Sequence, residues 1–132
     1  MKTLYVEHAN ITVNNLDRGI DLYKTAFPDF KIRGGGWSNG RKWIYLGNEE
    51  SYIALNESLE SINYSSSGIN HLDFVVENIQ IVTDRLIAAG YKRNYLKAIE
   101  GFRIRDYFAD DDGNQYEFIE YLSNKIEEKN KY

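Results

Sequence analysis

Hydrophobic and polar residues alternate in several short segments of this 132-residue chain, and a period of two predicts β-strands with one buried face. One strand is expected around each of the two histidines, in "YVEHANITV" and "INHLDFVV". The other predicted strands are 29–34, 41–47, 51–57, 91–96, 103–109 and 115–121.

Two further segments repeat their apolar residues every three or four positions, which predicts amphipathic helices. The apolar faces consist of Leu16, Ile20, Tyr23 and Phe27 in the first helix, and Ile79, Val82, Leu86 and Ala89 in the second. Asp17 is expected to cap the first helix, and Gly90 occupies the position of a C′ glycine after the second.

The same order of elements, strand–helix–strand–strand–strand, therefore occurs twice, with an offset of 63 residues from His8 to His71. We expect module one at about 3–56, a linker at 57–67, module two at about 68–122 and a charged tail at 123–132. A module of this size barely buries a core alone, so the two are expected to form one α+β domain, 1–132. Its curved sheets would surround a shared central cavity.

Composition narrows the classes of partner. The formal net charge is −4 and no basic stripe is present, which argues against binding to nucleic acid or to an anionic membrane. No apolar run approaches 18 residues, and the N-terminus becomes polar too early for a signal peptide. The absence of cysteine excludes disulfides and a thiol nucleophile. A cytoplasmic location is the expectation.

The repeat also relates residues that carry chemistry. Glu117 in the last strand corresponds to Ala54 in module one, just as His71 corresponds to His8. Two imidazoles and one carboxylate suit a divalent transition-metal ion with open coordination positions. The simpler interpretation is that the histidines only pack against their neighbours and that Glu117 lies on the surface of an edge strand.

The two histidine segments and the ending "DDGNQYEF" resemble the vicinal oxygen chelate superfamily, which includes glyoxalase I, extradiol dioxygenases, fosfomycin-resistance enzymes and bleomycin-resistance proteins. The resemblance covers residues 3–122 and is greatest to small glyoxalase-like bacterial proteins. It implies that His8, His71 and Glu117 bind one divalent ion (Fe, Mn, Ni or Zn), and that the protein is a homodimer acting on a small molecule. Ala54 replaces the fourth ligand of glyoxalase I, so the pattern is more similar to the three-ligand enzymes.

Further residues are candidates for substrate binding. Strand alternation places Arg103, Arg105 and Tyr107 on one face, where the arginines would hold a carboxylate or phosphonate, unless that face is simply solvated. Tyr52 shares a face with Ala54 and would line the cavity. By resemblance to the fosfomycin enzymes, Lys97 matches a substrate-binding lysine and Tyr107 a site tyrosine. Tyr107 is therefore the candidate catalytic residue.

Two segments resemble a phosphate-binding loop and a calcium-binding loop but lack the defining residues. "RGGGWSNG", residues 33–40, lacks the ending of a phosphate-binding loop and is interpreted as a flexible loop between strands. The acidic run 110–112 lacks the spacing of a calcium loop and is interpreted as a hairpin turn.

Two functions remain open. The first is a metal-dependent enzyme acting on a small molecule chelated through adjacent oxygens, with lyase or isomerase, dioxygenase or thiol-transferase chemistry. The alternative is a metal-free binding protein of the bleomycin-resistance type, in which tyrosines and tryptophans form the walls of the site.

Overall fold

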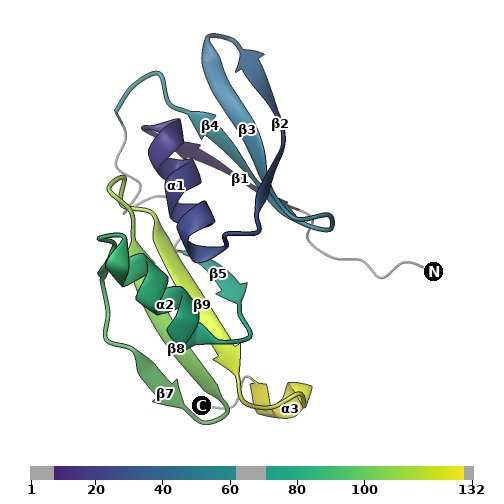
Figure 1. Ribbon diagram of the computed structural model, residues 1–132, viewed down its shortest axis with the longest axis vertical. Helices are drawn as coiled ribbons and strands as arrows, with labels where there is room; N and C mark the ends of the chain where they lie inside the picture. The colour runs from purple at the N-terminus through teal and green to yellow at the C-terminus, as the bar shows by residue number, and fades with distance from the viewer. Residues whose placement is uncertain (1–7, 62–70, 130–132) are drawn as a thin grey trace, which may run out of the picture. The chain divides into compact units, whose positions relative to one another are not determined.

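The computed structural model describes residues 8–61 and 71–129, which fall into two compact units that divide after residue 62 (Figure 1). Each unit is described by itself. The elements of the first unit are β1 (His8–Val13), α1 (Leu16–Ala26), β2 (Lys31–Ser38), β3 (Arg41–Gly47) and β4 (Tyr52–Glu57). Those of the second are β5 (Leu72–Val75), α2 (Ile79–Ala88), β6 (Lys92–Arg93), β7 (Ala98–Glu100), β8 (Arg103–Ala109), β9 (Gln115–Tyr121) and α3 (Ile126–Lys129).

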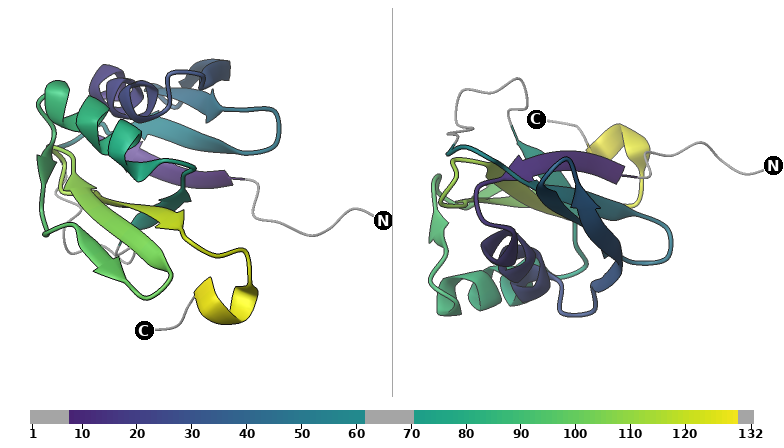
Figure 2. Two further views of the ribbon diagram at one scale, coloured as in Figure 1. Left: turned by 60° about the horizontal axis from the view of Figure 1, so that its bottom comes forward. Right: turned by 90° about the horizontal axis from the view of Figure 1, so that it is seen from above.

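The first unit is a four-stranded sheet in the order β1-β4-β3-β2, and we call it sheet A. Its first strand pairs in parallel with its last, and the remaining pairs are antiparallel. Helix α1 contacts β3 and β4 and lies on one side of sheet A (Figure 2). Gly19 on the helix comes close to the side chains of Val13 and Leu55, which identifies these buried residues as the helix-facing layer.

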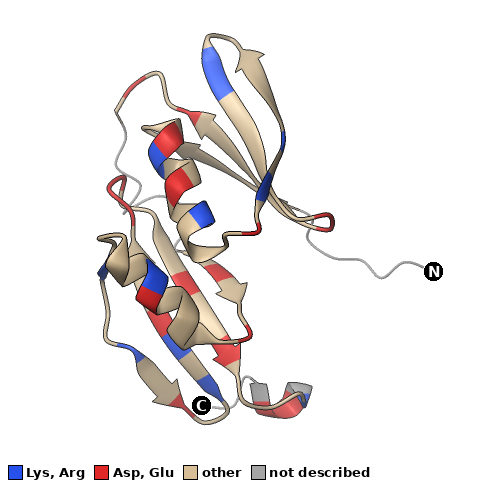
Figure 3. Ribbon diagram, viewed as in Figure 1, with Lys and Arg blue, Asp and Glu red and all other residues tan. Residues whose placement is uncertain are grey.

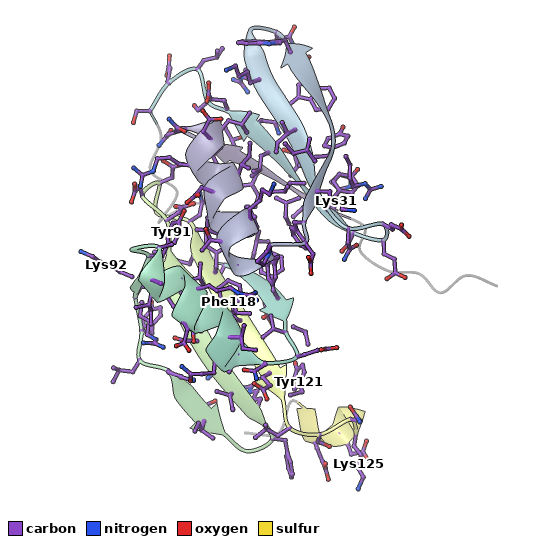
Figure 4. The ribbon with its side chains drawn as sticks, in the orientation of Figure 1. Lys31, Tyr91, Lys92, Phe118, Tyr121 and Lys125 are labelled. Atoms are coloured by element: carbon purple, nitrogen blue, oxygen red, sulfur yellow. The ribbon has the colours of Figure 1, made fainter. Side chains whose placement is uncertain are left out.

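The second unit, sheet B, has the order β5-β9-β8-β6, and β7 also pairs with β8. Again the first strand is parallel to the last. Helix α2 contacts β8 and β9 and covers the buried rings of Phe108 and Phe118, the latter labelled in Figure 4. Gly90 follows the helix with a φ of 91°, and the amides of Gly90 and Tyr91 donate to Ile87 and Leu86. This is a Schellman motif, and it confirms the predicted C′ glycine.

The predicted duplication is confirmed in the hydrogen bonds that begin the two helices. The backbone amide of Leu16 donates to Glu57 Oε2 at 2.9 Å, and the amide of Ile79 donates to Glu120 Oε2 at 2.8 Å. Both glutamates lie at the end of the last strand of their unit, and they are separated by the same 63 residues as the histidines. A carboxylate at a helix N-terminus satisfies a free N–H and complements the helix dipole. The same offset in the sequence could have revealed this pair.

The cap of α1 was predicted wrongly. Asn15, not Asp17, is the N-cap, and its side chain accepts a hydrogen bond from the amide of Arg18. Asn78 caps α2 in the same way, through the amide of Ile81. Asp17 lies inside the first turn, where its charge interacts favourably with the helix dipole but does not cap the helix.

The glycine-rich segment was also predicted wrongly, because residues 33–38 are part of strand β2 rather than a flexible loop. Gly35 is paired with Ile44, and a Cβ on Gly35 would lie 2.9 Å from the carbonyl oxygen of Trp43. The chain reverses only at Asn39 and Gly40, which have positive φ angles. The glycines therefore allow β2 to approach β3 closely, and they do not break the strand.

In the second unit the predicted strand 91–96 shortens to β6, and β7 follows as a strand that the pattern did not predict. Strand β8 and strand β9 have the predicted bounds, and β4 runs to Glu57, one residue into the expected linker. The start of module one, most of the linker and the end of the tail lie outside the described residues. None of the described helices is long and apolar enough to cross a membrane.

Candidate metal and anion site on sheet B

The face of sheet B opposite α2 carries most of the predicted site residues. The cross-strand pairs Tyr107–Glu117 and Arg105–Ile119 place these side chains on one face, because neighbouring residues of a strand point to opposite sides. Basic segments of β8 lie beside acidic segments of β9 in Figure 3. The shared face of Arg103, Arg105 and Tyr107 is therefore confirmed.

Glu117 is the centre of this face. The residue is only 5% exposed, and burial of a carboxylate is unfavourable unless positive groups or donors surround it. His71 Nε2 lies 2.9 Å from Glu117 Oε2, and the Tyr107 hydroxyl donates to Oε1 at 2.9 Å. Arg105 Nη1 lies 3.6 Å from the same Oε1 atom. Glu117 is thus a buried residue with specific partners, and not the surface residue of the simpler interpretation.

The hydroxyl of Tyr107 is held in its protonated form. Desolvation by burial, together with the hydrogen bond to Glu117, raises the pKa of Tyr107 to about 12. The phenol therefore acts as a hydrogen-bond donor to Glu117 at neutral pH. Its ring also meets the rings of His71 and Tyr95 edge-on, with centroids 6.3 and 5.4 Å apart.

Two arginines, one buried and one partly exposed, extend the site along β8. The side chain of Arg103 is 4% exposed and that of Arg105 is 20% exposed, so the interpretation of this face as a solvated surface is wrong. Glu100 of β7 approaches both: its Oε2 lies 2.7 Å from Arg105 Nη2 and 3.7 Å from Arg103 Nη2. Sequence reasoning missed Glu100 because β7 itself was not predicted.

Asp73 is a second residue that the sequence analysis missed. It lies directly opposite Glu117 in the parallel pair of β5 and β9. Desolvation and the neighbouring Glu117 carboxylate raise the pKa of Asp73 to about 6, although the side chain keeps access to solvent. The signal was available, since Asp73 is two residues after His71 and so lies on the same face of its strand.

Lys97 lies elsewhere in the unit. Its Nζ donates to Gln80 Oε1 at 2.8 Å, and Gln80 belongs to α2, the helix on the opposite face of sheet B from Glu117. The structure therefore associates Lys97 with the helix, and brings His71, Arg103, Arg105, Tyr107 and Glu117 together without it.

The remaining predicted site residues lie on sheet A. His8 stacks on Tyr52, with ring centroids 4.6 Å apart, and Ala54 is 2% exposed. Tyr45 pairs across the strands with Ala54, as Tyr107 pairs with Glu117. Sheet A thus repeats the histidine and the tyrosine of the sheet B cluster, with a methyl group in place of the carboxylate.

The donor atoms on sheet B fit a transition-metal ion in kind. An imidazole nitrogen and a carboxylate oxygen meet at Glu117, and the tyrosine hydroxyl orients that carboxylate from behind, as partners of metal ligands commonly do. Within residues 71–129 no third histidine or carboxylate completes a three-ligand group. The three-ligand set therefore stays a prediction, since His8 belongs to the other unit.

Comparison with known proteins supports the fold. The chain is similar to a glyoxylase/bleomycin resistance protein/dioxygenase domain from Frankia sp. EAN1pec, with a TM-score of 0.75, 22% identity, and coverage of 91% of this chain and 99% of that one. A glyoxalase family protein from Bacillus cereus gives a TM-score of 0.73 at 18% identity, with coverage of 93% and 97%. The fosfomycin resistance protein FosX from Listeria monocytogenes gives 0.71 at 19% identity, with coverage of 97% and 99%.

No protein-family model matches the sequence, and no curated protein matches it. At these identities the structural matches establish the architecture: the chain has the α+β fold of the vicinal oxygen chelate superfamily. The resemblance inferred from the sequence is confirmed at that level. The location of the cavity and the identity of the ligands stay predictions.

Proposed function

We propose that the protein is a metal-dependent enzyme that acts on a small molecule bound to the ion through adjacent oxygens. The observation that supports this most is the contact of His71 Nε2 with Glu117 Oε2, at 2.9 Å, on a buried carboxylate whose other oxygen is held by Tyr107. In this proposal His8, His71 and Glu117 bind one divalent ion, and Ala54 leaves room for substrate or water.

A divalent ion in this position would act as a Lewis acid on the chelated oxygens. The residues of the chain supply orientation and charge. Tyr107 fixes the Glu117 carboxylate as a hydrogen-bond donor, because its pKa of about 12 keeps the phenol protonated at neutral pH. Arg103 and Arg105 give the same face a positive charge that suits an anionic group of the substrate. Tyr52 would contribute a wall from sheet A.

Metal content tests this proposal directly. Purified protein is loaded with Fe(II), Mn(II), Ni(II) or Zn(II), desalted and measured by elemental analysis. We expect about one ion per chain, and loss of that ion in His8→Ala, His71→Ala and Glu117→Gln. The control is Glu77→Gln, which makes the same charge change at an exposed residue outside the cluster and should keep the ion.

Further variants distinguish a third ligand from the same chain and a third ligand from a second chain. Wild-type binding that survives in His8→Ala would contradict the predicted ligand set, and no binding of any of the four ions would contradict the proposed enzyme. Mixing His8→Ala with His71→Ala restores a complete set only if ligands come from two chains of the expected homodimer. Light scattering after gel filtration measures that dimer independently.

A second function, metal-free binding of a flat molecule, is favoured by one feature of sheet A. Trp43, Tyr45, Tyr52 and His8 form a continuous row, with successive ring centroids 4.9, 4.8 and 4.6 Å apart. Arg33 lies over Tyr52, 4.4 Å from the ring centroid. Rings in a half-exposed row can stack against a planar ligand. The test uses a Trp37→Phe variant, in which Trp43 is the remaining tryptophan, and planar aromatic compounds in metal-free buffer. Quenching of Trp43 fluorescence that is lost on Tyr45→Ala would support metal-free binding. Absence of quenching would exclude this second function.

A further inference from the structure

Glu100 occupies a position that suits the anionic group of a ligand. Its Oε2 atom accepts a hydrogen bond from Arg105 Nη2 at 2.7 Å and lies 3.7 Å from Arg103 Nη2. Two guanidinium groups that converge on one oxygen form a typical site for a carboxylate or phosphate group. The carboxylate of the chain itself therefore marks where an external oxyanion would bind.

The exposure of the three side chains shows from which side a ligand would approach. Glu100 is 38% exposed, whereas Arg105 is 20% and Arg103 is 4% exposed. Glu100 is thus the most exposed member of the group, so a ligand would reach the arginines from its side. Removing Glu100 takes one negative charge away from two largely desolvated guanidinium groups, of which Arg105 keeps Glu117 at 3.6 Å, and so favours binding of an external anion.

Strand β7, which carries Glu100, is held more weakly than the strands behind it. It has three residues, pairs only with β8 within the described part of sheet B, and is followed by Gly101 with a φ of 53°. Its central residue, Ile99, is 74% exposed. Short strands with few buried contacts open at low free energy. Displacement of Glu100 therefore leaves the core of sheet B intact.

We propose that Glu100 is an internal competitor for an oxyanion subsite formed by Arg103 and Arg105, and that a ligand bearing a carboxylate, phosphate or phosphonate displaces it from Arg105. The inference deepens the proposed function by naming the substrate class, and it rests on that function only for the role of the subsite in a reaction. Anion binding itself is independent of metal.

The competition predicts that removal of the Glu100 charge strengthens anion binding. The apparent dissociation constant of a ligand equals the intrinsic constant divided by the fraction of protein in which the site is open, and Glu100→Gln raises that fraction. We expect phosphonoacetate to bind Glu100→Gln at least about fivefold more tightly than wild type. Binding is measured by calorimetry on EDTA-treated full-length protein at constant ionic strength set with chloride.

Two variants control for charge and for site. Glu77→Gln makes the same change in net charge at an exposed residue and should bind phosphonoacetate as wild type does. The double variant Glu100→Gln/Arg105→Gln should lose the gain. Acetate and inorganic phosphate, titrated separately, distinguish a carboxylate from a phosphate-type subsite. Equal or weaker binding to Glu100→Gln, or an equal gain in Glu77→Gln or in the double variant, would overturn the proposal.

Thermal stability supplies a second measurement if Glu100→Gln folds poorly. The uncovered arginines should lower the midpoint of unfolding in chloride, and phosphate at the same ionic strength should restore it more than it stabilises wild type. No preferential rescue by phosphate would contradict an oxyanion subsite. Because neither measurement involves metal, failure here is distinct from failure of the metal-content test.

Discussion

Tyr107 and Tyr45 offer a comparison at the level of single residues, because both face the last strand of their sheet at equivalent positions. Tyr107 donates to Glu117, whereas Tyr45 lies opposite Ala54. Partners of metal ligands typically contribute 10- to 100-fold to metal affinity. Tyr107→Phe should therefore weaken metal binding about tenfold, as measured by competition with a chelating dye. Tyr45→Phe should leave it unchanged, and an equal loss in both variants would contradict the assigned role.

Asp73 makes folding depend on pH in the metal-free protein. Its pKa is raised to about 6 in the fold, above the value of about 3.9 expected in an unfolded chain. The native state therefore keeps the proton longer, and the free energy of unfolding decreases as the pH rises through this window. Asp73→Asn should remove this decrease and stabilise the protein at pH 7, by under about 1 kcal/mol because the carboxyl is solvent-accessible. Urea unfolding at pH 4 and pH 7 in EDTA measures it, and a larger benefit at pH 4 would be inconsistent with the shift.

Some site residues were predictable one by one, and others were not. His8 and His71 stood out because two rare side chains recur at one offset, and Glu117 because a carboxylate in an apolar strand is costly to bury. The structure brings His71 and Glu117 into contact. Glu100 has no such signal, since a glutamate in a short polar segment resembles any surface residue. Its role follows only from the pairing of β7 with β8.

At the scale of elements, the helix caps provide a direct test of the corrected assignment. Asn15 accepts from the amide of Arg18, and loss of such an N-cap typically lowers stability by about 1 kcal/mol. Asn15→Ala should therefore destabilise the protein by about that amount, whereas Asp17→Ala should change the free energy of unfolding by less than half as much. Chemical denaturation of the two variants in parallel measures the difference. The reverse order would restore Asp17 as the cap.

Strand β2 makes a second prediction from its glycines. A Cβ on Gly35 would meet the carbonyl oxygen of Trp43 at 2.9 Å, whereas a Cβ on Gly34 would find its nearest atom at 4.0 Å, on the ring of Tyr45. Backbone atoms in a sheet cannot move aside easily. Gly35→Ala should destabilise the protein by about 1–3 kcal/mol, and Gly34→Ala should be neutral or slightly stabilising. Thermal unfolding of both variants distinguishes a close-packed strand from a loop, in which neither change would matter.

The elements that the sequence predicted well share one property: a regular pattern with clear ends. Strands β8 and β9 flank the Asp110–Gly113 turn, where the Asp110 carboxylate accepts hydrogen bonds from the amides of Asp112 and Asn114. Strand β2 has glycine at three successive positions, so the alternation of apolar and polar residues cannot predict a strand there. There the pairing with β3 decides the structure, and the local sequence does not.

For the whole molecule, the duplication made the fold predictable, because one offset relates the histidines, the capping asparagines and the glutamates that hold the helices. The two sheets also share one strand order, with the last strand beside the first. The duplication does not determine the chemistry of the site, since Ala54 and Glu117 occupy equivalent positions but only Glu117 can bind a metal ion. The predicted site is therefore asymmetric: one unit supplies a histidine and a carboxylate, and the other supplies a histidine alone.

This asymmetry determines how metal should affect stability. An ion that binds only the folded chain stabilises it by about 2.7 kcal/mol at a free concentration 100 times its dissociation constant. The proposal requires that wild type gain this stabilisation and that both His8→Ala and Glu117→Gln lose most of it. Ala54→Glu, which adds a carboxylate oxygen as a fourth ligand at the position equivalent to Glu117, should increase the stabilisation by metal, although burial of that carboxylate lowers the stability of the metal-free protein. Unfolding of all four proteins with and without the tightest-binding ion measures these differences. A wild-type gain that persists in His8→Ala would show that the cluster on sheet B binds the ion without sheet A.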